Sequence, residues 1–185
     1  MTDNIVLTLV ATLGYAGLGI GMLMEFMGIP FPGELTLGFA GFLLWRGVLS
    51  FAPTLTVALG LSWVGSLVAY LLGARLGRPF LLKYGKYGGL NEKRISKVEN
   101  LFNQHNIIIL IFGRFISGVR PLSAYLAGMS GMPFFSFATI SFIGTALWTS
   151  TFIFIGYYLG PGWEKIGPYA VSLGFVFLTL SIVVS

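Results

Sequence analysis

Four charged residues of this sequence lie in apolar segments that proline and glycine interrupt. Glu25 and Glu34 flank one break, and Arg114 and Arg120 flank a second one. Arginine stays charged under all relevant conditions and presents a planar fork of N–H donors that suits phosphate oxygens. A carboxylate in a low-dielectric site exchanges a proton when its surroundings change. The arginines are therefore predicted to bind a phosphate group, and the glutamates to couple the site to protons or to pair with the arginines.

The breaks decide whether each pair of charges can face one cavity. A continuous α-helix turns about 100° per residue, so neither the glutamates nor the arginines would share a helix face at their spacing. The proline that follows Arg120 is expected to hold that arginine outside the helical region. Because each pair is separated by helix breakers, we expect the four charges to converge on one site. The breaking residues are Pro30, Pro32 and Gly33 in the first segment and Gly118 and Pro121 in the second.

Composition places these charges in an integral membrane protein. The chain has 185 residues, of which 56% are hydrophobic and 9% are charged, whereas soluble domains are about 25% charged. An ionisable residue at membrane depth costs about 2.5–3.5 kcal/mol on insertion scales, so such residues are candidates for function. We therefore predict a single all-α membrane domain over residues 1–185. The absence of cysteine excludes disulfides and cysteine-bound metals.

Basic residues are concentrated in one loop, which predicts the orientation of the chain. Seven of the eleven lie between Arg75 and Lys97, and this is the positive-inside signature of a cytoplasmic loop. The net charge of +5 therefore indicates an inner membrane surface and not a nucleic-acid partner. Within the loop, residues 91–105 are predicted to form an amphipathic helix on the inner leaflet. Its expected apolar face comprises Ile95, Val98, Leu101 and Phe102.

The elements that position the charges are predicted to form an inverted repeat. Broken backbone at membrane depth requires cover by protein or by a watery cavity, so each broken segment is interpreted as a re-entrant hairpin. A cytoplasmic basic loop makes the two hairpins enter from opposite sides and places both termini in the cytoplasm, as in secondary transporters. The expected elements are a retained span at 5–24, repeat 1 at about 25–77 (hairpin 25–45, helix 53–76), the basic loop and amphipathic helix at 78–105, repeat 2 at about 106–160 (hairpin 106–126, span 134–160) and a terminal helix at 166–185.

A structural role for the four charges competes with a binding role, because two glutamates and two arginines also suffice to hold the halves together as ion pairs.

Enzyme chemistry has little support. The sequence has one histidine, His105, and no Gly-x-Ser-x-Gly motif or cluster of metal ligands. We therefore expect no catalytic residue, metal or cofactor.

At these same residues the chain resembles the DedA family of membrane proteins, which is related to the VTT-domain lipid scramblases. The matching motifs are Glu25…Pro30-Phe-Pro-Gly-Glu34, Gly65…Tyr70-Leu-Leu-Gly73, Phe102-Asn-Gln-His105 and Gly113-Arg114-Phe-Ile-Ser-Gly-Val-Arg120. The resemblance implies two facing re-entrant helices and transport of phosphorylated lipids. It also implies that the acidic pair and the arginine pair are essential. Ser66 departs from the aspartate of many members, and Ser117 from their proline.

The predicted function is that of a flippase, a translocase that moves a phosphate-headed lipid across the cytoplasmic membrane. The preferred substrate is undecaprenyl or another polyprenyl phosphate, and coupling to protons and a homo-oligomeric state are left open. The alternatives are a phosphatidylethanolamine translocase, a proton-coupled transporter of small ions or drugs, and a membrane-organising protein that transports nothing.

Overall fold

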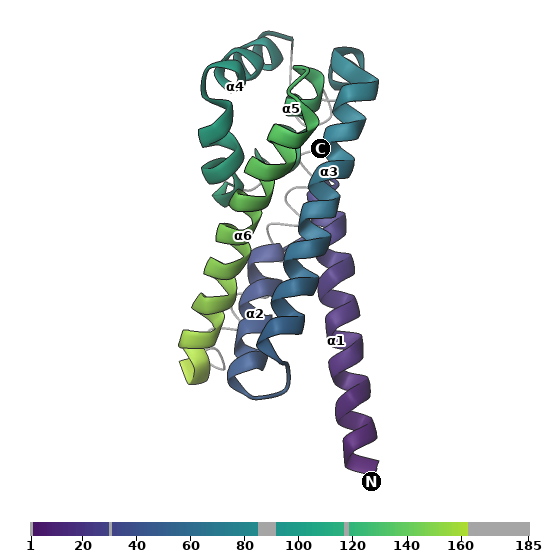
Figure 1. The fold of residues 1–185 in the computed structure, drawn as a ribbon, viewed down its shortest axis with the longest axis vertical. Helices are drawn as coiled ribbons and strands as arrows, with labels where there is room; N and C mark the ends of the chain where they lie inside the picture. Colours follow the sequence, from purple (N-terminus) through teal and green to yellow (C-terminus); the bar gives the residue numbers. More distant parts are fainter. Residues whose placement is uncertain (1, 30, 85–91, 117–118, 163–185) are drawn as a thin grey trace.

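The computed structural model describes residues 2–29, 31–84, 92–116 and 119–162, and all regular elements in these ranges are helical (Figure 1). The all-α prediction is therefore confirmed for the described residues. The helix predicted at 166–185 lies outside them. In chain order the elements are α1 (Thr2–Phe26), α2 (Gly33–Trp45), α3 (Phe51–Tyr84), α4 (Glu92–Phe112), the 3₁₀ turn η2 (Gly113–Phe115), α5 (Val119–Met129), α6 (Phe134–Leu159) and the 3₁₀ turn η3 (Gly160–Gly162).

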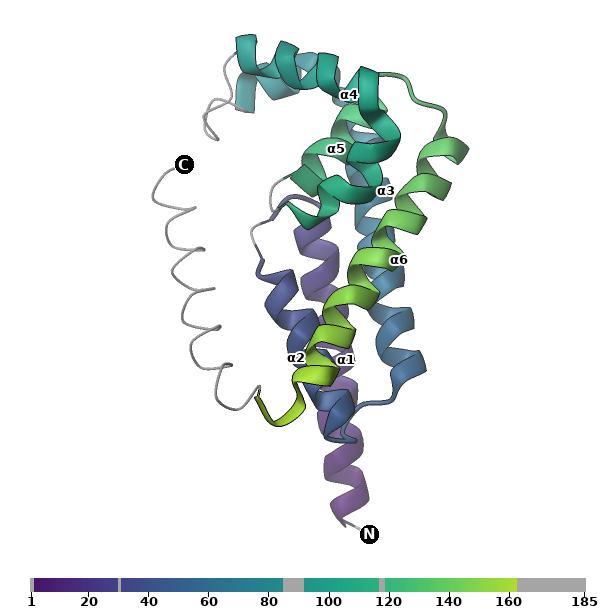
Figure 2. The same cartoon turned by 90° about the vertical axis from the view of Figure 1, so that its left-hand side faces the viewer.

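Two long antiparallel helices, α3 and α6, run through the middle of the bundle (Figures 1 and 2). Both are long and apolar enough to cross a membrane: an 18-residue stretch within Phe51–Pro79 has a mean hydropathy of 1.9, and one within Phe134–Gly162 has a mean hydropathy of 1.6. The sequence predicts the end of the first of them at about residue 76. Regular helical backbone does stop there, because Gly77 adopts φ 59° and ψ −161° before the helix resumes.

Each half of the chain contributes a helical hairpin whose tip reaches the middle of the bundle (Figure 2). The first consists of α1 and α2. Its tip packs on α3 at Gly65, where an added Cβ would lie 2.8 Å from the carbonyl oxygen of Leu23. The second consists of the end of α4, η2 and α5. It packs on α6 at Gly144, where an added Cβ would lie 2.6 Å from the carbonyl oxygen of Leu110.

The structure corrects the prediction for the N-terminal segment. The sequence predicts a separate span at 5–24 and then a hairpin from Glu25, but α1 continues through Phe26. No breaker interrupts α1, so this one helix is itself the first arm of the hairpin. Its N-terminal part therefore lies beside the α2–α3 connection, where Tyr15 Oη accepts a hydrogen bond from the backbone N–H of Ser50 at 2.9 Å. The start of α1 and the α4 end of the molecule lie at opposite ends (Figure 1), and the side of the membrane on which the termini lie stays a prediction.

The predicted amphipathic helix is the first part of α4, which bends at His105 (φ −134°, ψ 33°). Ile95 and Phe102 lie on the expected apolar face, but this face is buried against α3 and α5 and not directed to the lipid surface. Leu101 is 52% exposed and does not belong to this face. The reason is helical phase: Leu101 follows Ile95 by six positions, which corresponds to about 240° of rotation.

Close glycine contacts fasten each hairpin to the long helix of the other half. α2 crosses α6 where the space of a Cβ on Gly41 is filled by the carbonyl group of Ile153. α5 crosses α3 where the space of a Cβ on Gly128 is filled by the carbonyl group of Tyr70. Glycine is required at both crossings because any side chain would separate the backbones. The hairpin tips are thereby held against each other between α3 and α6.

Candidate functional site

The four predicted charges meet at the hairpin tips. The first hairpin supplies Glu25, in the last turn of α1, and Glu34, in the first turn of α2. The second supplies Arg114 in η2 and Arg120 in the first turn of α5. The Nε–H of Arg120 donates a hydrogen bond to the backbone carbonyl of Arg114 at 2.8 Å, which joins the two arginines directly. The convergence expected from the breaks is present in the structure.

Arg120 is the centre of the cluster. Its Nη1 lies 2.5 Å from Oε1 of Glu25, and its Nη2 donates a hydrogen bond to Oε1 of Glu34. The guanidinium also lies over two aromatic rings, 4.1 Å from the centroid of Trp148 and 5.6 Å from that of Phe26. A cation over an aromatic face is attracted by the ring quadrupole, more strongly when water is excluded. Arg120 is therefore neutralised by two carboxylates and confined by two rings.

Arg114 has a different environment, although it is completely buried. Its Nε–H donates to the backbone carbonyl of Leu110 at 2.9 Å, and its terminal nitrogens donate to Oγ of Ser66 at 3.2 Å and of Ser141 at 2.6 Å. Within the described part of the chain, no carboxylate lies at ion-pair distance from Arg114. A buried charge is costly unless a counter-charge accompanies it. Arg114 is thus a cation held by neutral oxygens.

The carboxylate of Glu25 occupies a space that is open only because residue 33 is a glycine; this space is called the seat of Glu25 below. The backbone N–H of Gly33 donates to Oε1 of Glu25 at 3.3 Å. A Cβ on Gly33 would lie 2.6 Å from the carboxyl carbon of Glu25, so any other residue would displace the carboxylate. Gly33 is also the first residue of α2, where the helix dipole favours a negative charge. The predicted breaker Gly33 therefore has a second role as the seat of Glu25.

Glu34 is less enclosed than Glu25. Its side chain is 31% exposed, whereas that of Glu25 is 9% exposed. The described contact of its carboxylate is to Arg120 and not to the backbone. Of the two carboxylates, Glu34 is therefore the one that can leave the arginine with less rearrangement.

The breakers act in part as predicted. Pro32 precedes the first residue of α2 and ends the turn between the first two helices. The second break differs from the prediction, because Arg120 and Pro121 both lie inside α5. Proline is tolerated in the first turn of a helix, where its missing N–H has no helical partner. The turn is made upstream instead, where Ile116 is extended (φ −105°, ψ 117°). Pro30 and Gly118 lie outside the described residues.

Sequence reasoning missed the neutral partners of the arginines. Ser66 departs from the aspartate of many family members, yet its hydroxyl accepts a hydrogen bond from Arg114. Trp148 is a further missed partner, because its fully buried ring lies under the guanidinium of Arg120. The available signal was the occurrence of serine on long apolar helices, at Ser66 in α3 and Ser141 in α6. Hydroxyls in such positions need partners when they are buried.

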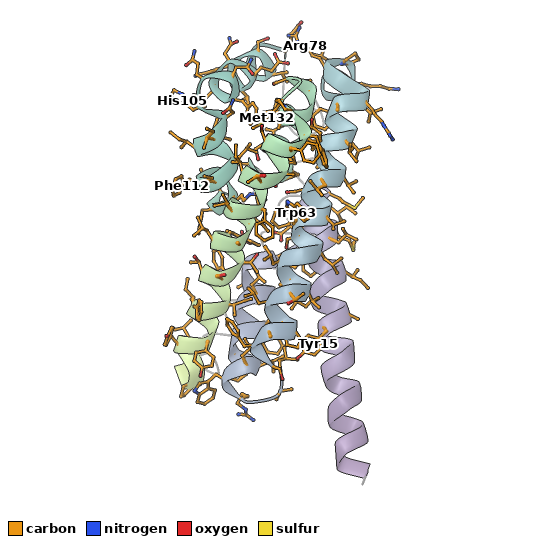
Figure 3. The ribbon with its side chains drawn as sticks, in the orientation of Figure 1. Tyr15, Trp63, Arg78, His105, Phe112 and Met132 are labelled. Atoms are coloured by element: carbon orange, nitrogen blue, oxygen red, sulfur yellow. The ribbon has the colours of Figure 1, made fainter. Side chains whose placement is uncertain are left out.

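The sole histidine lies outside this cluster. His105 is exposed on the outer side of α4 (Figure 3). Among the described residues there is also no group of three histidine, cysteine or acidic side chains that could hold a metal ion. The chemistry of the cluster is therefore that of two guanidiniums, two carboxylates, hydroxyls and aromatic rings.

Comparison with known proteins agrees with this arrangement. Residues 31–158 match the VTT domain, a segment that contains Glu34, both arginines and the helices α2 to α6. The protein belongs to the VTT-domain family of DedA-type membrane proteins, which confirms the resemblance seen in the sequence.

Three relatives illustrate the family. "Uncharacterized membrane protein YbfM" of Bacillus subtilis is 33% identical over 157 residues, which cover 85% of this chain and 97% of the relative. "Undecaprenyl phosphate transporter A" of the same species is 29% identical over 179 residues, covering 97% and 88%. An "Alkaline phosphatase-like protein" of Lactococcus lactis subsp. cremoris is 29% identical over 169 residues, covering 89% and 79%. No solved structure matches the chain.

Proposed function

We propose that this protein translocates a lipid with a phosphate headgroup across the cytoplasmic membrane, with Arg114 and Arg120 binding the phosphate. The observation that carries the proposal is the complete burial of Arg114 among neutral acceptors, directly beside a second arginine. A phosphate group would supply the negative charge that this position lacks, in the geometry that guanidinium groups favour. The relative that is named as an undecaprenyl phosphate transporter supports a polyprenyl phosphate as the lipid.

In the proposed membrane arrangement, α3 and α6 span the bilayer and the two hairpins re-enter it from opposite sides. The glycine crossings support an inverted repeat, because they correspond residue by residue. Gly41 of α2 contacts Ile153 of α6, as Gly128 of α5 contacts Tyr70 of α3. Glycines of the long helices make matching contacts with the hairpins. Secondary transporters with inverted repeats bind their substrates where such broken segments meet. The matching contacts are Gly156 with the carbonyl group of Gly38 and Gly73 with the carbonyl group of Tyr125.

The charge balance of the cluster gives protons a role in this cycle. With both arginines and both glutamates ionised, the four side chains carry no net charge. A phosphate would therefore bring uncompensated negative charge into a low-dielectric site, where such charge is costly. Protonation of Glu34 offsets one such charge and frees Arg120 to bind a phosphate oxygen. Glu25 stays seated on Gly33, and the lipid tail remains in the bilayer beside the helices.

The test is translocation in proteoliposomes. A fluorescent polyprenyl phosphate is placed in both leaflets, and the fraction that dithionite quenches from outside is followed with time. We expect Arg114→Ala to abolish translocation while helical content and size-exclusion profile stay those of the wild type. Arg75→Ala, at an exposed basic position of α3, is the matched control and should transport normally. Normal translocation by Arg114→Ala would overturn the proposal, and release of inorganic phosphate would indicate hydrolysis instead.

The same vesicles separate the competing functions. Equal movement of labelled phosphatidylethanolamine would broaden the substrate to phospholipids, and flux of a soluble cation without lipid carrier would indicate an ion transporter. The pairing of Arg120 with both glutamates also favours a purely structural role, in which these ion pairs hold the two halves of the protein together. In that case, replacing Glu25, Glu34 and Arg120 together by glutamine would leave the wild-type phenotype intact.

A further inference from the structure

A set of hydroxyl side chains lies completely buried on α3 and α6, and only two of them touch Arg114. Successive residues of this set are four or eight positions apart within each helix, so the members that are four apart share one helix face. This is the face that each helix presents to the interior of the bundle, since none of the six is exposed. The residues are Thr54, Ser62 and Ser66 on α3 and Ser141, Thr145 and Thr149 on α6.

The register of the two helices places these hydroxyls in one row between α3 and α6, called the file below. Arg114 donates to both Ser66 and Ser141, so these two positions lie opposite each other. Because α3 and α6 are antiparallel (Figure 2), Ser62 is expected to lie opposite Thr145 one helical turn further on, followed by Thr149 on the next turn of α6. The file therefore begins at Arg114 and continues toward the end of the bundle where α3 starts.

Two members of the file lack the hydrogen bond that a hydroxyl on a helix normally makes. Thr54 and Thr145 donate to the carbonyl group four residues earlier, at 2.8 and 2.7 Å. The hydroxyls of Ser62 and Thr149 have no partner among the described residues, and neither has the indole N–H of Trp148. A buried polar group without a partner costs about 1–3 kcal/mol, and buried water is the usual partner in such places. The described threonines outside this set that also donate to such a carbonyl are Thr36, Thr56, Thr139 and Thr151.

We propose that the interface between α3 and α6 contains a row of water molecules. Water bound by Ser62 and Thr149 relays protons along this row between the charge cluster and the α2–α3 end of the bundle. Each hydroxyl and each water accepts one proton as it passes another on, so the relay leaves the file chemically unchanged. The α2–α3 end is the predicted outer side, because the basic loop lies at the other end. The relay rests on the proposed function, since it supplies the protons exchanged at Glu34.

Hydration is tested without reference to transport. The chain contains no cysteine, so a single introduced thiol is unique. Ser62→Cys and Thr149→Cys are exposed to Ag⁺, a thiol-reactive ion small enough to follow a file of water, and unreacted thiol is then counted by mass spectrometry. The control is Ala69→Cys, a buried position on α3 inside an apolar cluster. We expect both test thiols to react several-fold faster than the control, and equal rates would overturn the proposal.

The proton relay is tested by removing the two hydroxyls. The double variant Ser62→Ala with Thr149→Val should lose the acceleration that a pH gradient gives to lipid translocation, while it binds the lipid normally. Thr151→Val, which removes an exposed hydroxyl of α6, is the control. If the hydroxyls are instead dry, their removal raises thermal stability and leaves the pH-gradient effect unchanged, and that result overturns the relay. Absence of translocation in the wild-type protein would overturn the proposed function, whereas the Ag⁺ result would still stand.

Discussion

At the scale of single residues, the site distinguishes two arginines that look equivalent in the sequence. Arg120 is paired with Glu25 and Glu34, whereas Arg114 is held by hydroxyl and carbonyl oxygens. Residue type and spacing were enough to predict which four charges converge. They were not enough to predict which arginine pairs with which glutamate. That pairing depends on the side of η2 or α5 from which each guanidinium projects. That detail is set by the extended backbone at Ile116, which no rule of helix periodicity describes.

The seat of Glu25 leads to a prediction for Gly33. Gly33→Ala would place a methyl group where the carboxylate now lies, so Glu25 would lose both its backbone hydrogen bond and its contact with Arg120. We expect loss of translocation and a lower free energy of unfolding, by about 3–5 kcal/mol if the buried ion pair is broken. Thermal unfolding in detergent and the dithionite assay measure the two effects.

Gly60→Ala is the matched control for Gly33→Ala. Gly60 lies within α3 with nothing within 4 Å of an added Cβ, so alanine there should stabilise the helix by about 0.5–1 kcal/mol. If Gly33→Ala behaves like Gly60→Ala, Gly33 is only a helix breaker and the seat has no functional role.

At the scale of the helices, the sequence predicted the type of each secondary-structure element better than the residues at which it begins and ends. Long apolar runs identify α3 and α6 because nothing but a helix satisfies backbone polar groups in such a segment. The error at α1 has a physical cause. Charge at Glu25 was taken as the start of a new element, but a single carboxylate does not interrupt a helix, and the backbone turns only after Phe26, with Gly28 at φ 100°. Helix ends follow backbone chemistry more closely than they follow charge.

The glycine crossings lead to a prediction at this scale. Gly128→Ala would force α5 away from α3, because the added Cβ meets the carbonyl group of Tyr70. We expect unfolding to become easier by about 1–3 kcal/mol, as in other overpacked interiors, and translocation to slow because Arg120 moves with α5. Gly17→Ala, on α1 with open space around it, should leave translocation unchanged and raise the free energy of unfolding by about 0.5–1 kcal/mol. Wild-type stability of Gly128→Ala would show that the crossing tolerates a wider separation.

At the scale of the whole molecule, the sequence predicted an inverted relation between the halves, which stays a prediction, and it did not predict that α1 is one arm of the first hairpin. Each charged break is followed along the chain by an Ala-Gly pair, at Ala40-Gly41 and at Ala127-Gly128. These glycines are the crossing points, so the sequence similarity has a packing cause. The extent of α1 along the bundle could not be predicted, because sequence does not tell whether the first apolar run crosses the bundle or stops at its middle. Contact of Tyr15 with Ser50 settles that it stops.

This arrangement predicts which parts of the protein lie on each side of the membrane. Ser50, at the α2–α3 end, and Asn103, on α4, are both exposed and lie at opposite ends of the bundle. With α4 on the cytoplasmic side, as the basic residues indicate, Ser50→Cys should react with a membrane-impermeant maleimide added to intact cells. Asn103→Cys should react only after the cells are permeabilised. Because the chain has no cysteine of its own, each signal comes from one position. Labelling of both positions from outside would contradict a membrane placed across α3 and α6, and the reverse pattern would show that the whole bundle, with its proposed proton file, is oriented the other way.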